Sequence, residues 1–103
     1  MAFKIIIKPL ARFDLDEAIL WYENELSGLG NRFYQAFIDA LERISKDPEA
    51  FMEISADVRR IVIKKFPYKV FYTISENKIF IIGIMHAKRS SGFLENRLNE
   101  GLK

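Results

Sequence analysis

The 103-residue sequence contains no cysteine, a single histidine and a single tryptophan. The absence of cysteine excludes a disulfide framework, a thiolate nucleophile and a cysteine-based zinc site, and one histidine cannot supply a histidine-rich metal centre. No apolar run approaches the roughly 20 residues that a membrane-spanning helix needs, and the first residues lack the layout of a signal peptide. We therefore expect a cytoplasmic protein that holds no metal or cofactor and does not engage a membrane.

The charged residues that are present are divided unevenly between the two halves of the chain. Residues 1–57 contain six Lys/Arg and eleven Asp/Glu, a formal charge of −5, whereas residues 58–103 contain ten and three, a formal charge of +7. The basic residues of the second half stand at the ends of β-branched and aromatic segments, which indicates a surface for an anion. The net charge of +2 is too small by itself to establish nucleic-acid binding.

The order of the hydrophobic patterns predicts a single α+β domain over residues 1–103. A strand over residues 3–8 precedes two amphipathic helices over residues 11–26 and 31–46, which the break Ser27-Gly-Leu-Gly30 separates. After a loop over residues 48–57, strands over residues 58–66, 68–75 and 78–85 predict an antiparallel meander. We expect a helix hairpin packed on one face of the sheet. The last strand is nearly all apolar, so we expect it to be buried on both faces or covered by the short tail that starts at residue 90.

Six short strings of residues follow one another through nearly the whole chain. They are Asp14-Leu-Asp-Glu-Ala18, Trp21-Tyr22, residues 30–37, Val58-Arg59, Tyr68-Lys-Val-Phe-Tyr72 and His86-Ala-Lys-Arg89. In this order and spacing they resemble the RelE/ParE toxins of bacterial type II toxin–antitoxin modules. The resemblance implies the α+β fold of that family, a role in growth arrest or plasmid stabilisation, and a cognate antitoxin that binds the toxin in a hetero-oligomer.

The family has two known activities, and the resemblance implies one of them or a degenerate toxin that only binds its antitoxin. RelE-like members cleave messenger RNA on the ribosome, whereas ParE-like members poison DNA gyrase and need no nuclease site. Two departures favour the ParE-like branch. The family's usual Tyr-Arg pair is Tyr68-Lys69 here, and lysine lacks the bidentate fork that grips a phosphate. The tail beyond Arg89 has no tyrosine, only Phe93 near where a nuclease tyrosine is expected.

A ribonuclease that works without metal needs a base, an acid and cations around one phosphate. If the chain is a nuclease, the candidates for these roles are His86, Lys69, Arg89, Arg60 and Glu95. A lone histidine at a strand end is, however, more often a structural hydrogen-bonding residue than a catalytic one. Strand alternation places Lys69 on the opposite face from Tyr68 and Tyr72, so these tyrosines are not expected to share a site with it.

If the chain instead binds an anionic target, the candidate ligands are Arg59, Arg60, Lys69, Lys88 and Arg89. We expect Lys69, Arg89 and at least one of Arg59 and Arg60 to converge on one side of the meander, because anion binding needs convergent charge. Arg59 and Arg60 point to opposite faces of their strand. An internal salt bridge is therefore as reasonable as a ligand contact for either of them, and Asp57 is the nearest acidic partner in sequence.

Two apolar residues of the first helix do not fit its buried face. Phe13 and Leu20 are seven residues apart and fall opposite the apolar positions, whereas Trp21 and Tyr22 are expected in the core. We expect Phe13 and Leu20 to be exposed and to form a docking site for the antitoxin. The docking segment would be an amphipathic helix or extended arm with acidic residues, and it would cover this stripe or the basic meander.

Overall fold

The structure is a computed structural model that describes residues 3–55, 57–89, 92 and 95–98. Within this part of the chain the strands form one five-stranded sheet in the order β1-β5-β4-β3-β2. Strand β1 (Lys4–Ile7) pairs in parallel with β5 (Lys78–His86), and each of the remaining strands pairs antiparallel with its sequence neighbour. These are β2 (Glu53–Ser55), β3 (Val58–Val62) and β4 (Tyr68–Ser75).

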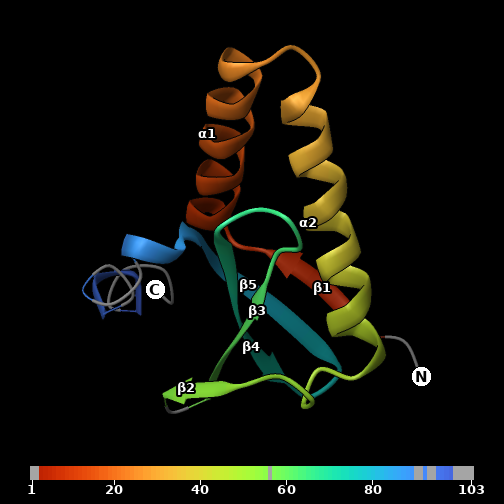
Figure 1. Cartoon of the computed structure of the whole chain (residues 1–103). Coiled ribbons are helices and arrows are strands. Elements are labelled where there is room, and N and C mark those ends of the chain that lie inside the picture. The colour runs from red at the N-terminus through yellow and green to blue at the C-terminus, as the bar shows by residue number, and fades with distance from the viewer. Residues whose placement is uncertain (1–2, 56, 90–91, 93–94, 99–103) are drawn as a thin grey trace.

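Two long helices form a hairpin that covers one face of this sheet, which we call the helix-side face (Figure 1). Helix α1 (Pro9–Glu25) begins at a proline, which suits the first helical position because its missing N–H has no partner there. Helix α2 (Leu29–Lys46) places Phe33 and Phe37 in the core, where both are fully buried. The core lies between the helices and the sheet, so apolar burial at 3.6-residue spacing fixes both helices.

The turn between the helices is closed by a side chain of α1. The Glu23 carboxylate accepts hydrogen bonds from the backbone N–H groups of Gly28 and Gly30 at 3.0–3.1 Å. These groups lie at the N-terminal end of α2, where the helix dipole favours an anion. Gly28 has a φ of 91°, which favours glycine. A Cβ at Gly30 would lie 2.7 Å from the Ile19 carbonyl oxygen, so the helices approach too closely there for a side chain.

Strand β5 contains one extra residue relative to β4. Tyr72 pairs with Ile81 and Phe71 pairs with Gly83, which leaves Ile82 as a β-bulge. The bulge reverses the alternation of β5, so that both Ile81 and Ile84 face the helices while Ile82 faces the other side. Residues after the bulge, including His86, therefore have the opposite orientation from the one that uninterrupted alternation would give them.

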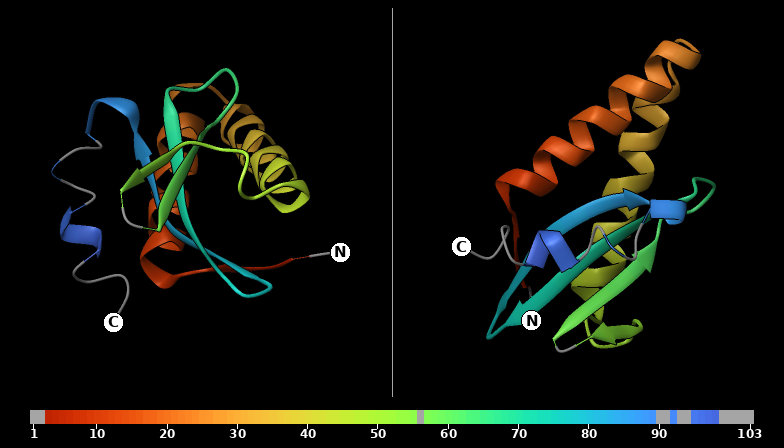
Figure 2. Two further views of the ribbon diagram at one scale, coloured as in Figure 1. Left: turned by 90° about the horizontal axis from the view of Figure 1, so that it is seen from below. Right: turned by 90° about the vertical axis from the view of Figure 1, so that its left-hand side faces the viewer.

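The second face of the sheet, which we call the outer face, carries a smaller apolar cluster of Val58, Phe71, Ile82 and Met85. Leu98 from the C-terminal tail packs against this cluster, which confirms that β5 is apolar because both of its faces are covered. A short 3₁₀ helix, η1 (Ala87–Arg89), leads from β5 into the tail. Figure 2 shows the short helical segment of residues 95–98 on the side of the molecule away from α2.

Two parts of the sequence prediction are wrong. The predicted loop over residues 48–57 contains strand β2, so the antiparallel part of the sheet has four strands in the described part of the chain. Trp21, predicted in the core, is 56% exposed, because it lies at the border of the buried face of α1.

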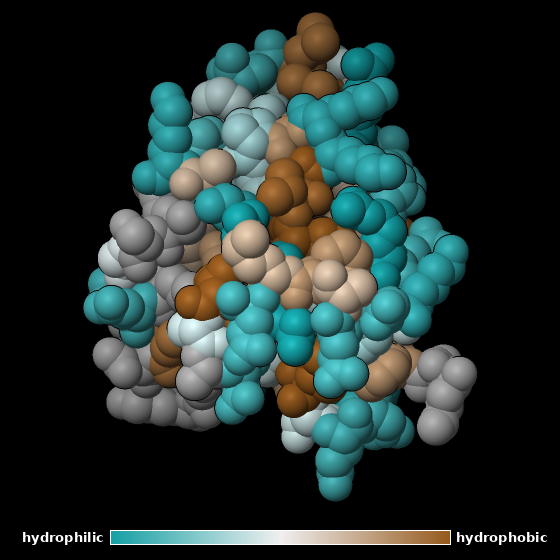
Figure 3. All heavy atoms as spheres, turned by 60° about the horizontal axis from the view of Figure 1, so that its bottom comes forward, coloured by the Kyte–Doolittle hydropathy of each residue, from teal (hydrophilic) through white to brown (hydrophobic). Residues whose placement is uncertain are grey.

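Neither helix in the described part of the chain is long and apolar enough to cross a membrane. Seen from the front and below, hydrophobic residues form a central strip bordered by hydrophilic ones (Figure 3).

Candidate functional site

A pocket of about 720 Å³ opens between α1 and the end of β5. Helix α1 contributes the side chains of Glu17, Trp21 and Tyr22, and β4 and β5 contribute Tyr68 and His86. The aromatic rings contact one another edge to face: the ring centroids of Trp21 and Tyr22 are 5.1 Å apart, and those of Tyr68 and His86 are 5.3 Å apart. This α1–β5 pocket is thus a largely aromatic hollow with a carboxylate at its border.

A buried ion pair closes one side of the pocket. Arg97 of the tail donates to both carboxylate oxygens of Asp14, at 2.6 Å and 3.1 Å, and the two side chains are only 8% and 9% exposed. The same carboxylate accepts the Ile84 N–H at 3.1 Å, and Arg97 also donates to the Ile82 carbonyl oxygen at 3.1 Å. Arg97 therefore ties the tail to α1 and β5 at once, and the Asp14 charge is satisfied inside the protein.

His86 lies on the helix-side face, where its ring packs on Tyr68. Its Nδ1 atom accepts the backbone N–H of Lys88 at 3.1 Å, which fixes Nδ1 as the acceptor nitrogen of the ring. Lys69 pairs with Met85 and Arg60 pairs with Phe71, so both cations belong to the outer face. The sheet thus separates the histidine from these cations, and it also separates Lys69 from Tyr68, as the alternation predicted.

Arg59 is occupied by the protein's own backbone. It donates to the carbonyl oxygens of Glu49 at 3.1 Å and Phe51 at 2.8 Å, and it lies 3.5 Å from a carboxylate oxygen of Glu53. The salt bridge considered for this residue therefore exists, but its partner is Glu53 rather than the sequence neighbour Asp57. These contacts hold the segment before β2 against β3, so Arg59 is a structural residue.

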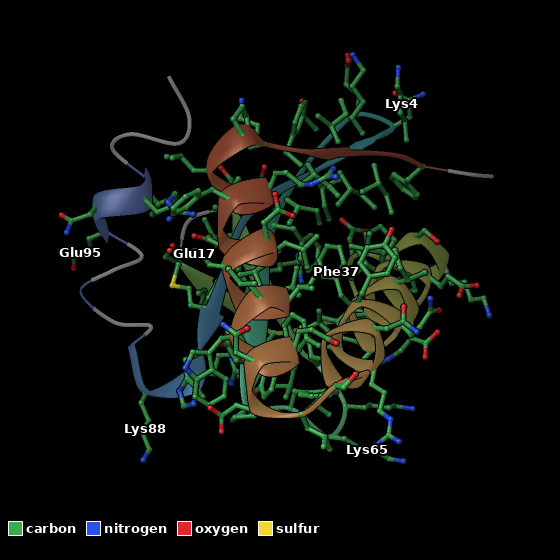
Figure 4. All side chains as sticks on the ribbon, turned by 90° about the horizontal axis from the view of Figure 1, so that it is seen from above. Lys4, Glu17, Phe37, Lys65, Lys88 and Glu95 are labelled. Atoms are coloured by element: carbon green, nitrogen blue, oxygen red, sulfur yellow. The ribbon has the colours of Figure 1, made fainter. Side chains whose placement is uncertain are left out.

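Lys69 and one of the two arginines converge as expected, because Arg60 and Lys69 share the outer face while Arg59 does not. The side chain of Arg89 lies outside the described residues. Lys88 is exposed in η1, and Glu95 is exposed in the tail. Figure 4 shows Lys88 and Glu95 projecting outward in different directions, so they do not form a common site.

Cations extend along the outer face beyond the predicted pair. Lys4 of β1 stands directly opposite Lys78 of β5 in the parallel register, and both are exposed. Like charges at facing positions repel, so this pair destabilises the isolated sheet slightly. Lys8 lies 5.7 Å from the centroid of the Phe80 ring, within range of a cation–π contact. The outer face is therefore basic from β1 to β3.

Two phenols, one half-buried and one fully buried, have raised pKa values. Burial, followed by the nearby Tyr68, raises the pKa of Tyr22 above its usual value. Tyr72 is fully buried and donates to the Pro48 carbonyl oxygen at 2.7 Å. Burial raises the pKa of Tyr72 to about 12, with Arg59 lowering it and Asp47 raising it as weaker effects. Both phenols stay neutral near pH 7, so neither supplies a base.

The exposed stripe on α1 has the geometry that the helical pattern predicted. Phe13 is 58% exposed and Leu20 is 62% exposed. The sequence reasoning missed the neighbouring Trp21 and Glu17 as pocket residues, and it missed Arg97 as the partner of Asp14. The positions of Asp14, Glu17, Ala18 and Trp21 on one side of α1 were visible in the sequence, but the strand that completes the pocket was not.

The described residues do not hold a cluster of three or more metal-ligating side chains. Of the two pocket carboxylates, Asp14 is engaged by Arg97, and the Nδ1 of His86 is engaged by Lys88. The pocket and the outer face thus have the chemistry of binding surfaces: an aromatic hollow with a carboxylate on one side, and a basic sheet face on the other.

Comparison with known proteins finds a matching family model and a similar toxin. A family model described as the ParE toxin of the type II toxin-antitoxin system parDE matches residues 5–91. Toxin ParE2 of Mycobacterium tuberculosis is 29% identical over 87 residues, which cover 84% of this chain and 83% of that protein.

Two solved structures have the same fold. A structure of the chromosomal ParDE TA system from P. aeruginosa matches with a TM-score of 0.73 and 13% identity, covering 82% of this chain and 96% of that one. A mutant of the E. coli toxin RelE in the free state matches with a TM-score of 0.62 and 15% identity, covering 99% and 96%. The family match spans most of the chain and the fold agrees with it, so this protein belongs to the ParE toxin family of type II toxin–antitoxin systems.

Proposed function

We propose that this chain arrests bacterial growth in the cytoplasm by binding DNA gyrase, and that a cognate antitoxin neutralises it. Membership of the ParE family supports a toxin role, and the P. aeruginosa structure that shares the fold is described as a toxin–antitoxin system. The resemblance of the sequence to ParE-like members supports gyrase as the target. The proposal is one of binding, so it requires complementary surfaces rather than a reaction centre.

One observation carries the choice of binding over RNA cleavage: the acid–base candidate and the cations lie on opposite faces of the sheet. His86 packs on Tyr68 on the helix-side face, while Lys69 and Arg60 stand on the outer face. A nuclease of this kind must bring an acid, a base and cations within hydrogen-bonding reach of one phosphate. Glu95, exposed on the tail, supplies no second acid–base group beside His86.

The outer face is the surface that we assign to the target. Arg60 and Lys69 at one end and Lys4 and Lys78 at the other flank the apolar cluster, so a partner that carries acidic groups would find charge complementarity across the sheet. Lys88, exposed in η1 after the end of β5, remains a candidate contact for the same target. Arg59 is excluded from it because its guanidinium binds the backbone of residues 49 and 51.

Purified protein tests this assignment in two parallel assays. We expect inhibition of supercoiling by purified gyrase and no cleavage of messenger RNA on translating ribosomes. Replacing Lys69 and Arg60 together by methionine should weaken gyrase inhibition at least about tenfold, in line with the loss of two charge contacts. Arg32→Met, which removes an exposed cation from α2, is the matched control and should have little effect. Messenger RNA cleavage without gyrase inhibition would establish the RelE-like activity instead, and inactivity in both assays would leave a protein that only binds its antitoxin.

The exposed stripe of Phe13 and Leu20 is the surface that we assign to the antitoxin. The two side chains are two helical turns apart on the solvent side of α1, a spacing that suits the apolar face of an amphipathic segment. Replacing both by serine should weaken antitoxin binding without unfolding the toxin, because neither side chain is buried. Unchanged affinity in the double variant, measured by calorimetry, would remove this stripe from the interface.

A further inference from the structure

The α1–β5 pocket, about 720 Å³ in volume, has no part in the surface that we assign to gyrase. Its wall includes Trp21, which is 56% exposed although it is the largest side chain of α1. An exposed indole leaves a large apolar surface in contact with water, which a polar residue at this position would not do. Together with Tyr22 and Tyr68, the indole presents aromatic surface to whatever enters the pocket.

The charge of the pocket is set by Glu17. Asp14 is neutralised by Arg97, whereas Glu17 has no ion-pair or hydrogen-bond partner among the described residues. The described residues that line the pocket include no lysine or arginine. Figure 4 shows Glu17 pointing away from α2, toward the side of the molecule on which Glu95 lies. A carboxylate beside aromatic rings attracts a lysine or arginine side chain through an ion pair and cation–π contacts.

The pocket is continuous with the antitoxin stripe. Glu17 is four residues after Phe13, three before Leu20 and four before Trp21, so on the helix surface it adjoins all three side chains. Asp16 nearby is paired with Arg12 at 3.5 Å, which leaves Glu17 as the uncompensated charge beside the stripe. An acidic segment would be repelled at this position, so the charges favour a basic residue there.

We propose that the α1–β5 pocket binds a lysine or arginine side chain of the antitoxin, with Glu17 as the counter-ion and Trp21 as the aromatic wall. The occupant is an amphipathic helix whose apolar residues lie on Phe13 and Leu20 and whose basic residue enters the pocket. This inference rests on the proposed antitoxin partnership. It replaces the acidic segment expected from the sequence at this stripe, and it leaves acidic groups of a partner to the outer face.

Trp21 is the only tryptophan of the chain, so its fluorescence reports on the pocket directly. The probe is N-acetyl-argininamide, and N-acetyl-citrullinamide serves as the uncharged control of nearly the same shape. We expect a saturable change with the arginine probe in the millimolar range, no saturable change with the citrulline probe, and perturbed amide resonances of Ala18 and Ile84 in the NMR spectrum. Equal responses to both probes, or no perturbation of either amide, would overturn the assignment.

Variants at Glu17 distinguish the contribution of the carboxylate to probe binding from the contribution of the pocket's shape. Glu17→Gln should weaken binding of the arginine probe about three- to fivefold, as expected for one partly exposed ion pair. Glu42→Gln removes an exposed carboxylate of α2 that does not line the pocket, and it should leave binding unchanged. Equal affinity of the two variants for the probe would show that Glu17 is not the counter-ion.

The cognate antitoxin that we propose provides the second arm. Glu17→Lys places a cation where a cation is expected to bind, so antitoxin affinity should fall at least about tenfold, against less than about twofold for Glu42→Lys. If the Glu17→Lys and Glu42→Lys variants bind the antitoxin with equal affinity and the antitoxin still neutralises growth arrest, the pocket is not an antitoxin-binding site. The proposed function would be unaffected by that result. Failure of the antitoxin to bind even the unmodified toxin would instead refute the proposed partnership. The probe experiment would then be the sole test of whether the pocket binds a basic side chain.

Discussion

Removing Arg97 should destabilise the whole fold, although the residue lies only a few positions from the C-terminus. In the Arg97→Met variant the Asp14 carboxylate, 9% exposed, keeps only the Ile84 N–H as a partner. Leaving one member of a buried ion pair unpaired costs about 3–5 kcal/mol. A domain of this size has a free energy of unfolding of roughly 5–15 kcal/mol, so the loss would take a large share of it.

Urea unfolding followed by circular dichroism measures this loss. With an m value of about 1.5 kcal/mol per molar urea, the midpoint should fall by about 2–3 M. Arg12→Met is the matched control, because it breaks the Arg12–Asp16 pair, whose side chains are 65% and 63% exposed. That pair should contribute no more than about 0.5 kcal/mol.

A double-mutant cycle then tests whether the effect comes from the pair. The Asp14→Asn and Arg97→Met changes together should cost clearly less than the sum of the two single changes, because the double variant leaves no buried charge. Two results would refute the reasoning: an Arg97→Met variant as stable as Arg12→Met, or single-variant costs that add. Either one would mean that the ion pair does not hold the tail.

Three other predictions concern the core, the helix hairpin and the basic residues. The pKa of Tyr72 is raised to about 12 from 10.0, so the stability it contributes is full below pH 10 and is lost as the pH rises from about 10 to 12. Tyr72→Phe should abolish a loss of about 1 kcal/mol between pH 8 and pH 11 in urea unfolding, and should itself cost about 1 kcal/mol at pH 8 because the Pro48 carbonyl loses its donor. Gly30→Ala should lower the thermal midpoint, since its Cβ meets α1 backbone at 2.7 Å; a rise, as helix propensity alone predicts, would contradict this close approach. Arg59→Met should cost about 1–3 kcal/mol through its lost backbone bonds while Lys69→Met costs less than about 0.5, and equal costs would place Arg59 among the free surface cations.

The helices and the exposed stripe were predictable because their signals are local. A 3.6-residue pattern over four or more turns fixes which side of a helix is buried, and Phe13 and Leu20 fall on the opposite side for the same reason. Strand β2 has only three residues and no useful periodicity. It forms because Arg59 binds the backbone of the preceding segment, a tertiary contact that propensity does not encode.

The site was harder to predict because its parts meet only in three dimensions. Asp14 and Arg97 are 83 residues apart, and neither differs in sequence from an ordinary surface residue. Asp14 looked like a favourable charge in the first turns of a helix, a role that many acidic residues have. The near-uniform apolar run of β5 concealed the bulge at Ile82, because alternation cannot be read where every residue is apolar.

That bulge decides which of two chemistries the sheet displays. Had Ile82 been paired as an ordinary strand residue instead of being bulged, simple alternation would have turned His86 onto the face that carries Lys69 and Arg60. An imidazole and two cations would then share one surface, which is the set of groups that phosphodiester cleavage uses. In this fold one bulged residue in a single strand is therefore enough to keep an imidazole apart from the basic face of the sheet.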